Sequence, residues 1–273
     1  MVTKLTIGQV LCQPIVPFAF LVSFGGLISF FFYCIKSGFA KTDKQISWIL
    51  TFASSLVCTV VSIPYFIQFW QSGWDMSRLG TDANGHTAMV CFFISYLVLD
   101  LSLGSIYYRH RITVLTGWIH HPLYIGILFW LLRCRSSSFF STNCILELPT
   151  LLLALGSFRD RWRCDLLFAA SFFVLRLVFH AYMILALKQS HRLEMLWLVA
   201  VAVFPLHLYW YYGILTQLIK RYSPSLKLAL FNPSPCLLTT DTVLSPAAAD
   251  TNTATHKKKR RPKHAFLDRI YTF

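Results

Sequence analysis

The chain has 273 residues, of which 56% are apolar, 16% are aromatic and only 13% are charged. Soluble domains carry roughly a quarter of their residues as Asp, Glu, Lys and Arg, so this composition excludes a soluble globular protein. The net charge is +14, from 25 basic and 11 acidic residues. The basic residues lie in short loops between apolar blocks and in the C-terminal tail, so membrane topology explains them better than nucleic-acid binding does.

Seven apolar blocks approach the roughly 20 residues that a helix needs to cross the hydrocarbon core. In chain order they cover residues 14–35, 46–69, 87–108, 112–132, 139–156, 166–187 and 193–219. The fifth block is the weakest, because it is short and contains Glu147 and Pro149, so a six-span variant with a re-entrant fifth segment stays open. Continuous apolarity indicates helices rather than a barrel. We expect an all-α membrane protein with about seven transmembrane helices.

The chain divides into three regions. Residues 1–45 hold the first span and its loop; the span is too long for a signal-peptide core, so we expect it to stay in the protein. Residues 46–222 hold the remaining spans. Residues 223–273 are rich in Ser, Pro, Thr and Ala, and they include a basic run at 257–263. This composition predicts a disordered tail.

The positive-inside rule orients the spans. One side carries Lys4, Arg78, Arg133, Arg135, Lys188 and Arg192. The other side carries Lys36, Lys41, Lys44, Arg109, Arg111, Arg159, Arg161, Arg163, Lys220, Arg221 and the basic tail. With seven spans, the second side and the C-terminus are predicted to be cytosolic. A six-span chain would change this assignment.

A few ionisable residues lie inside the predicted spans, where a charge needs a partner or a hydrated cavity. They are Asp100 in the third span, His120 and His121 in the fourth, Glu147 in the fifth, Arg176 and His180 in the sixth, and His207 in the seventh. The sequence shows no spacing typical of a metal site. These residues are therefore the candidate functional groups.

Their depths can be compared from the turns between spans. Asp100 lies ten residues before His110 and His120 lies ten after it. At about 1.5 Å per residue, both sit roughly 12–15 Å from the helix ends. Glu147 lies fourteen residues before Arg161 and Arg176 fifteen after it, so this second couple is also level. A common depth predicts a shared polar chamber.

Helical spacing predicts that His180 and Tyr124 also line the chamber. Arg176 and His180 are spaced i, i+4, and His121 and Tyr124 are spaced i, i+3, so each couple shares one helix face. The alternative is that Glu147 and Arg176 form a purely structural pair between helices. His207 fits a histidine that bonds to a backbone carbonyl. Adjacent His side chains point about 100° apart, so His120 and His121 need separate polar contacts.

These residues also carry a resemblance to a known family. The chain is similar to the TLC-domain family over about residues 46–222, in Asp100, Tyr107-Tyr108-Arg109, Thr116-Gly117-Trp118-Ile119-His120-His121, Leu146-Glu147-Leu148-Pro149-Thr150 and Phe172-Phe173-Val174-Leu175-Arg176. That family includes ceramide synthases, translocating-chain-associated membrane proteins and smaller TLC-domain-containing transmembrane proteins. The resemblance implies a helix bundle around a central, lipid-accessible cavity, in the endoplasmic reticulum membrane.

In ceramide synthases the paired His, which match His120 and His121 here, serve acyl transfer from acyl-CoA to a sphingoid amine. A level carboxylate such as Asp100 would fix a catalytic imidazole's tautomer. Ceramide synthases continue with His-Asp and a second Asp, whereas this chain keeps only Glu147 downstream. The chain therefore resembles the small TLC-domain proteins more closely, many of which are tied to membrane lipid composition.

Two functions are expected from this resemblance. The first is lipid handling, with membrane lipids and acyl chains as partners and no nucleic acid. The second is ceramide-synthase-like N-acyl transfer, with catalytic His120, His121 and Asp100, with acyl-CoA as a substrate and without a resident cofactor or metal. In both cases Tyr124, Glu147, Arg176, His180 and His207 line the cavity. Arginines at 109, 111, 159, 161 and 163 would hold the CoA phosphates in the second case, or simply follow the positive-inside rule.

Overall fold

The computed structural model describes residues 4–190, 193 and 195–231, and this part of the chain is helical without strands. The α-helices are α1 (Ile7–Leu11), α2 (Ile15–Lys36), α3 (Asp43–Ile46), α4 (Ile49–Gln71), α5 (Asn84–Tyr107), α6 (His120–Arg133), α7 (Ser137–Asn143), α8 (Leu148–Phe158), α9 (Asp165–Phe172), α10 (His180–Ser190) and α11 (Leu196–Phe231). Two π-helical segments, η3 (Val114–Ile119) and η6 (Phe173–Phe179), continue directly into α6 and α10. Short 3₁₀ turns are η1 (Met76–Gly80), η2 (Arg109–Arg111), η4 (Cys144–Glu147) and η5 (Asp160–Trp162).

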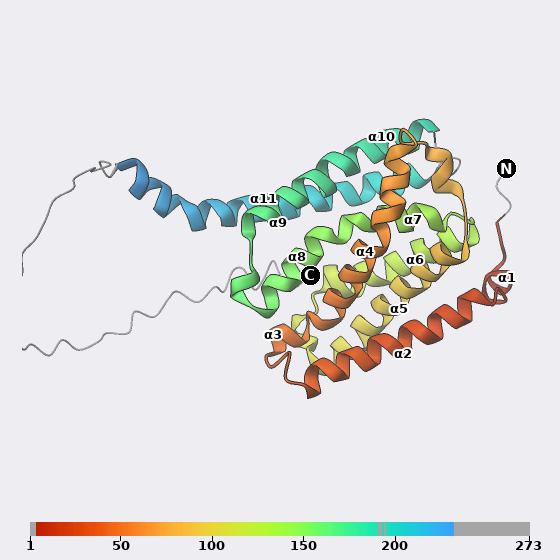
Figure 1. Ribbon diagram of the computed structural model, residues 1–273, viewed down its shortest axis with the longest axis horizontal. Helices are drawn as coiled ribbons and strands as arrows, with labels where there is room; N and C mark the ends of the chain where they lie inside the picture. Colours follow the sequence, from red (N-terminus) through yellow and green to blue (C-terminus); the bar gives the residue numbers. More distant parts are fainter. Residues whose placement is uncertain (1–3, 191–192, 194, 232–273) are drawn as a thin grey trace, which may run out of the picture.

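In the described part of the chain, α2, α4, α5, η3–α6, α7–α8, α9–α10 and α11 run in turn between the two ends of an antiparallel bundle (Figure 1). At one end, the N-terminal end, the backbone N–H of Leu5 donates to the carbonyl of Arg133 at 2.9 Å. At the opposite end, which we call the basic end, Gln45 Nε2 donates to the carbonyl of Phe158 at 2.9 Å. There Asp43 Oδ2 also lies 3.8 Å from His110 Nε2. The η3–α6 segment therefore runs the full height of the bundle.

Six helices within the described residues are long and apolar enough to cross a membrane. They cover Ile15–Lys36, Asp43–Gln71, Asn84–Tyr107, Ser137–Phe158, Asp165–Ser190 and Leu196–Ser223. The predicted all-α membrane fold is thus confirmed. The fifth predicted span, which the sequence left open as re-entrant, is one of the six. The fourth, at 112–132, is not; it consists of η3 and the short α6, and its Gly117, His120, His121 and Pro122 interrupt the apolar run.

Small polar side chains allow α4 to lie in the middle of the bundle, against α5, α7 and α8. Ser54 and Ser62 are buried and donate to the carbonyls of Thr51 and Thr59, three residues earlier, at 3.1 and 2.9 Å. Such bonds satisfy a hydroxyl within its own helix, and small residues let neighbouring backbones approach closely. The first span, α2, packs on the outside against α5.

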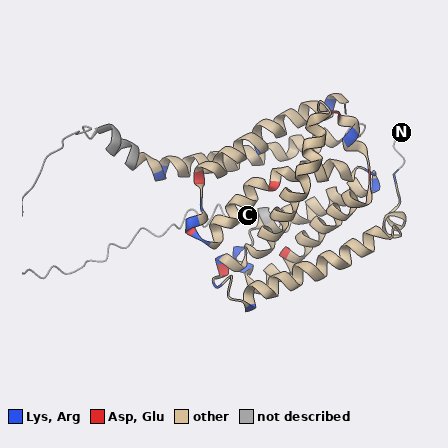
Figure 2. Cartoon of the chain, viewed as in Figure 1, with Lys and Arg blue, Asp and Glu red and all other residues tan. Residues whose placement is uncertain are grey.

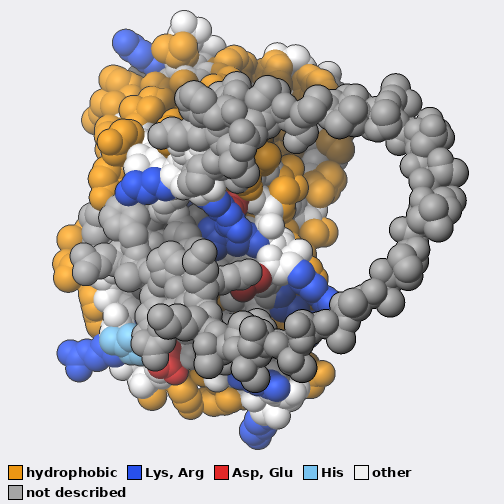
Figure 3. Space-filling model, turned by 90° about the vertical axis from the view of Figure 1, so that its left-hand side faces the viewer, with side chains coloured by type: hydrophobic (Ala, Val, Ile, Leu, Met, Phe, Trp, Pro, Cys, Tyr) orange, Lys and Arg blue, Asp and Glu red, His pale blue; other side chains and the backbone are white. Residues whose placement is uncertain are grey.

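The basic end gathers most of the loop arginines, and Figure 3 shows this face with cationic and acidic side chains side by side. Asp165 at the start of α9 contacts Arg163 Nε at 2.6 Å and also pairs with Arg221 of α11. Arg159 and Arg161 lie over the ring of Trp162. Figure 2 shows most Lys and Arg residues at the two ends of the bundle.

Helix α11 continues to Phe231, past Tyr222, where the sequence predicts that the disordered tail begins. The short run Leu226-Lys227-Leu228-Ala229-Leu230 consists of good helix formers, which explains the extension. The rest of the predicted tail, residues 232–273, lies outside the described residues, as does its basic run.

Candidate functional site

A cavity of about 260 Å³ lies inside the bundle, between α4, α5, α6, α8, η6, α10 and α11. Every candidate residue from the sequence lines it: Asp100, His120, His121, Tyr124, Glu147, Arg176, His180 and His207. Residues from five of the predicted spans thus line one chamber.

The Glu147–Arg176 couple is in direct contact. Arg176 Nη2 lies 3.1 Å from Glu147 Oε1 and donates to Thr150 Oγ1 at 2.8 Å, while its Nε donates to the carbonyl of Leu146 at 3.0 Å. The couple joins η6 to the η4–α8 corner. The Arg176 side chain is 13% exposed, so little water can replace these bonds. Three acceptors make the buried charge tolerable at this depth.

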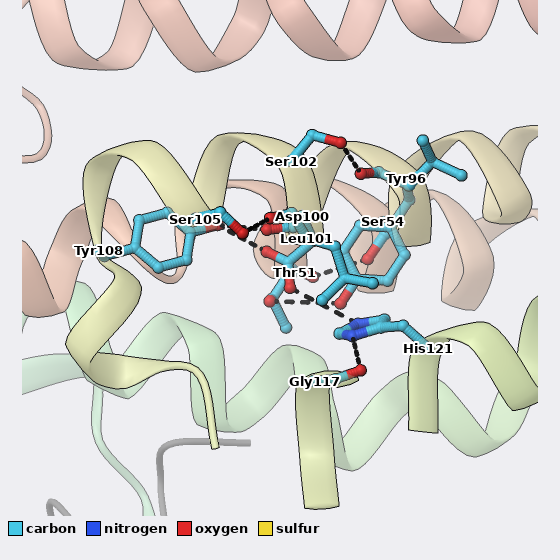
Figure 4. Close-up of polar contacts among 11 residues, drawn as sticks. Thr51, Ser54, Tyr96, Asp100, Leu101, Ser102, Ser105, Tyr108, Gly117 and His121 are labelled. Carbon is cyan, nitrogen blue, oxygen red and sulfur yellow. Dashed lines mark hydrogen bonds and ion pairs between the residues drawn. The ribbon is translucent and has the colours of Figure 1, made fainter. Parts of the chain in front are cut away.

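Asp100 contacts His121 and not His120, the histidine that the residue count makes level with it. Asp100 Oδ2 lies 3.5 Å from His121 Nε2, and Tyr108 donates its hydroxyl to Asp100 Oδ1 at 2.7 Å. On the other side of the ring, His121 Nδ1 lies 3.2 Å from the carbonyl of Gly117. Figure 4 shows Asp100 between Tyr108 and His121.

The π-helical turn explains why the second histidine reaches Asp100. A π-helix has more residues per turn than an α-helix, so the six residues of η3 rotate the following helix relative to an α-helical count. Two glycines make room for this arrangement. A Cβ on Gly117 would lie 2.2 Å from Ile112 Cγ2, and a Cβ on Gly104 would lie 2.7 Å from the ring of Tyr108. Gly104 therefore lets Tyr108 fold back along α5 onto Asp100.

Both ring nitrogens of His121 are occupied by oxygen acceptors. If Nδ1–H donates to Gly117, a neutral ring presents a lone pair on Nε2, so Nε2 and Asp100 attract each other only when one of these two side chains carries an additional proton. In either arrangement no lone pair of His121 faces the cavity. His121 therefore positions the α5–α6 contact rather than meeting a ligand.

The ring nitrogens of His120, unlike those of His121, are available to a molecule in the cavity. Its ring stacks on Tyr124 with centroids 5.3 Å apart, and within the described residues its nitrogens have no hydrogen-bond partner, although they are not sealed from the cavity. A neutral imidazole in this position can accept a proton or an acyl group from a bound molecule.

His180 and His207 form a second histidine pair. Their Nδ1 atoms lie 2.9 Å apart, and His207 Nδ1 is 3.1 Å from the carbonyl of Arg176. The expected carbonyl contact of His207 is therefore present. The pair joins η6 and α10 to α11, so it fixes the position of the last helix beside the chamber.

Four participants were not among the candidate site residues from the sequence: Tyr108, Gly117, Leu146 and Thr150. Tyr108 lies eight residues after Asp100, a spacing that no helical period predicts, because the helix ends at Tyr107 and the chain turns back. Thr150 follows Glu147 by three residues on the same helix face, so the i, i+3 rule is the signal that would have found it.

The cavity is apolar on both sides of this polar band. Towards the N-terminal end it is lined by Leu131, Leu187 and Leu196, and towards the basic end by Phe168 and Ile214. Phe168 and Leu187 lie near opposite ends of the α9–α10 span, so the cavity is elongated along the helices. Its shape and lining suit a hydrocarbon chain with a polar group near its middle depth.

No group of His, Cys, Asp and Glu in the described residues is arranged to hold a metal ion. Comparison of the chain with protein-family models, with curated proteins and with solved structures finds no match.

Proposed function

We propose that this protein binds a membrane lipid in the cavity and thereby influences the lipid composition of its membrane. The elongated apolar cavity with a polar band at mid-depth, inside a bundle of membrane-spanning helices, carries this proposal. Hydrocarbon would fill the apolar parts, and the donors of the band would meet a carbonyl, hydroxyl or amide group. The resemblance of the motifs to the TLC-domain family supports it.

The same resemblance supports a location in the endoplasmic reticulum membrane. The Lys and Arg content of the basic end supports a cytosolic position for that end and for the C-terminus. The polar band would then lie midway between the cytosolic and lumenal faces.

A second candidate is N-acyl transfer from acyl-CoA to a long-chain amine. It is favoured by His120, which lines the cavity with no hydrogen bond to another described residue. In this reaction His120 takes a proton from the amine while the amine nitrogen bonds to the thioester carbonyl carbon; the carbon–sulfur bond breaks and the CoA thiol leaves with a proton. The products are an amide and free CoA.

The arginines of the basic end bear on this candidate. Arg163 is engaged with Asp165, whereas Arg159 and Arg161 lie against Trp162 at the protein surface. The latter two would be the phosphate-binding groups of a CoA mouth. Asp165 contacts Arg163 and Arg221, so the basic end is less positive than the arginine count indicates.

The two candidates are separated by one experiment on purified protein in lipid nanodiscs. Labelled acyl-CoA and a panel of long-chain amines are added to the wild type, to His120→Ala and to His121→Ala, and both the amide product and the co-purified lipid are measured. His120→Ala is the informative variant, because it leaves the Asp100–His121 contact intact and should stay folded.

Amide formed by the wild type and lost in His120→Ala would identify an acyltransferase. Absence of amide, with an acyl lipid retained by the wild type and reduced in His120→Ala, would identify a lipid-binding protein. If the wild type forms no amide and also retains no lipid, both proposals are contradicted.

A further inference from the structure

Within the described residues, the wall of the cavity is a ring of packed helices that is interrupted between α6 and α11. Helix α5 packs against α4 and α6, α4 packs against α8, α8 against α9, and α9, η6 and α10 against α11. Helices α6 and α11 both line the cavity, yet they make no comparable packing contact with each other. The ring is therefore open along the line between α6 and α11.

Side-chain contacts show which flank of α11 faces this gap. His207 and Tyr211 pack onto the α9–α10 span, with His207 bonded to His180 and the Tyr211 ring stacked on Phe172. Ala202, Leu206 and Tyr209 lie on the opposite flank by helical spacing. The side of α11 that faces α6 therefore has no helix packed on it within the described residues.

Small and apolar side chains border the gap on both sides. On α6 they are Leu123, which is 60% exposed, and Ile127; on α11 they are Ala202 and Leu206, with exposed Tyr209 beyond them. Ile127 and Leu206 also line the cavity, so the gap and the cavity are continuous. The border carries no charged side chain.

The position of the gap along the membrane-spanning helix α11 indicates which solvent surrounds it. Helix α11 is long and apolar enough to span a membrane, and the border residues lie in its first half, away from the basic end. At this depth the surroundings of an exposed Leu or Ala are lipid acyl chains. A passage here leads from the hydrocarbon core of the bilayer directly to His120 and His207.

We propose that the gap between α6 and α11 is a lateral portal, through which the hydrocarbon chain of a bilayer lipid passes into the cavity. This inference rests on the proposed lipid-binding function and adds the route and the source of the ligand. A ligand that uses it is a lipid already dissolved in the membrane, rather than a water-soluble molecule delivered through the basic end.

The test closes the portal with a covalent link between α6 and α11. Leu123 lies eight residues from Leu131 and Ala202 lies six from Leu196; because these two leucines line the cavity at the same end, Leu123 and Ala202 are nearly level. Both are changed to Cys in full-length protein whose Cys12, Cys164 and Cys236 are replaced by Ser, and a flexible bismaleimide links them. A matched control links Leu185→Cys on α10 to Val201→Cys on α11, two exposed positions on helices that already pack together.

The probe is phosphatidylcholine with a diazirine in the middle of one acyl chain, incorporated in the nanodisc bilayer. After illumination, mass spectrometry locates the label. Leu146 and Leu153 report the cavity, because they line its wall on the far side from the gap. Leu21 of α2 is 74% exposed and reports the bilayer.

The portal predicts label at Leu146 and Leu153 in the unlinked protein and in the linked control, and loss of that label in the α6–α11 linked protein, with Leu21 labelled throughout. Equal cavity labelling after α6–α11 linking would overturn the portal while leaving lipid binding intact. A covalent dimer in place of the internal link would show that a second copy covers the gap, which also overturns it. No cavity label in any sample would contradict the proposed function itself.

Discussion

Arg176 is held by three acceptors, and the Glu147 carboxylate is its only charged partner among the described residues. Replacing Arg176 with Leu leaves that carboxylate uncompensated inside the bundle, at a cost of about 3 kcal/mol of unfolding free energy. Adding Glu147→Gln should restore part of this loss, because the residual charge is removed. Thermal unfolding in nanodiscs measures both, with Arg161→Leu as a surface control; additive effects would count against the pairing.

The two adjacent histidines should respond differently to truncation. His121→Ala removes the partner of Asp100 Oδ2, so we expect a loss of about 1–3 kcal/mol and less folded protein in the membrane. His120→Ala removes a ring without a hydrogen-bond partner in the described chain, so folding should be nearly unchanged while lipid retention falls. Expression level and co-purified lipid, measured side by side, check this; equal loss of folding in both variants would refute the division of roles.

Tyr108 supports His121 through Asp100. Tyr108→Phe keeps the ring against Gly104 and removes only the hydroxyl that donates to Asp100 Oδ1 at 2.7 Å. The free energy of unfolding should fall by about 1 kcal/mol, from the lost hydrogen bond alone. The nitrogen-15 chemical shifts of the His121 ring report whether its protonation changes. An unchanged spectrum together with unchanged stability would show that Tyr108 does not act on this pair.

At the scale of elements, the π-helical turn before α6 and the one before α10 both carry site residues. The first depends on Gly117, where a Cβ would lie 2.2 Å from Ile112 Cγ2. We expect Gly117→Ala to destabilise by about 1–3 kcal/mol, and Ile112→Ala in the same protein to recover most of this loss. Gly126→Ala in α6 is the matched control, because nothing lies within 4 Å of its added methyl group. A neutral Gly117→Ala would refute the close approach.

The sequence predicts most elements because apolar block length and loop charge are local properties. It also predicts that Glu147 and Arg176 meet, since depth follows from counting residues to a turn. It does not predict the histidine that meets Asp100, because η3 departs from the α-helical count, and no local signal marks a π-turn. The contact of Tyr108 with Asp100 is not predicted either, because it depends on where α5 ends and on how the chain folds back.

At the scale of the whole molecule, the distribution of Lys and Arg predicts that the basic end faces the cytosol. The described residues make an odd number of passes, α2, α4, α5, η3–α6, α7–α8, α9–α10 and α11, so the two termini should lie on opposite sides of the membrane. Tags at each end of the full chain, tested with protease on sealed microsomes, measure this. The C-terminal tag should be digested and the N-terminal tag protected; the reverse pattern would overturn the orientation.

The central claim is that the cavity holds a lipid chain, and the most direct test is to fill the cavity. Val203 lines it from α11, whereas neighbouring Val201 is 40% exposed on the outside of the same helix. Native mass spectrometry of protein released from nanodiscs should detect a bound lipid in the wild type and in Val201→Trp, and none in Val203→Trp. A wild type without lipid, or a Val203→Trp variant that keeps it, would contradict the account.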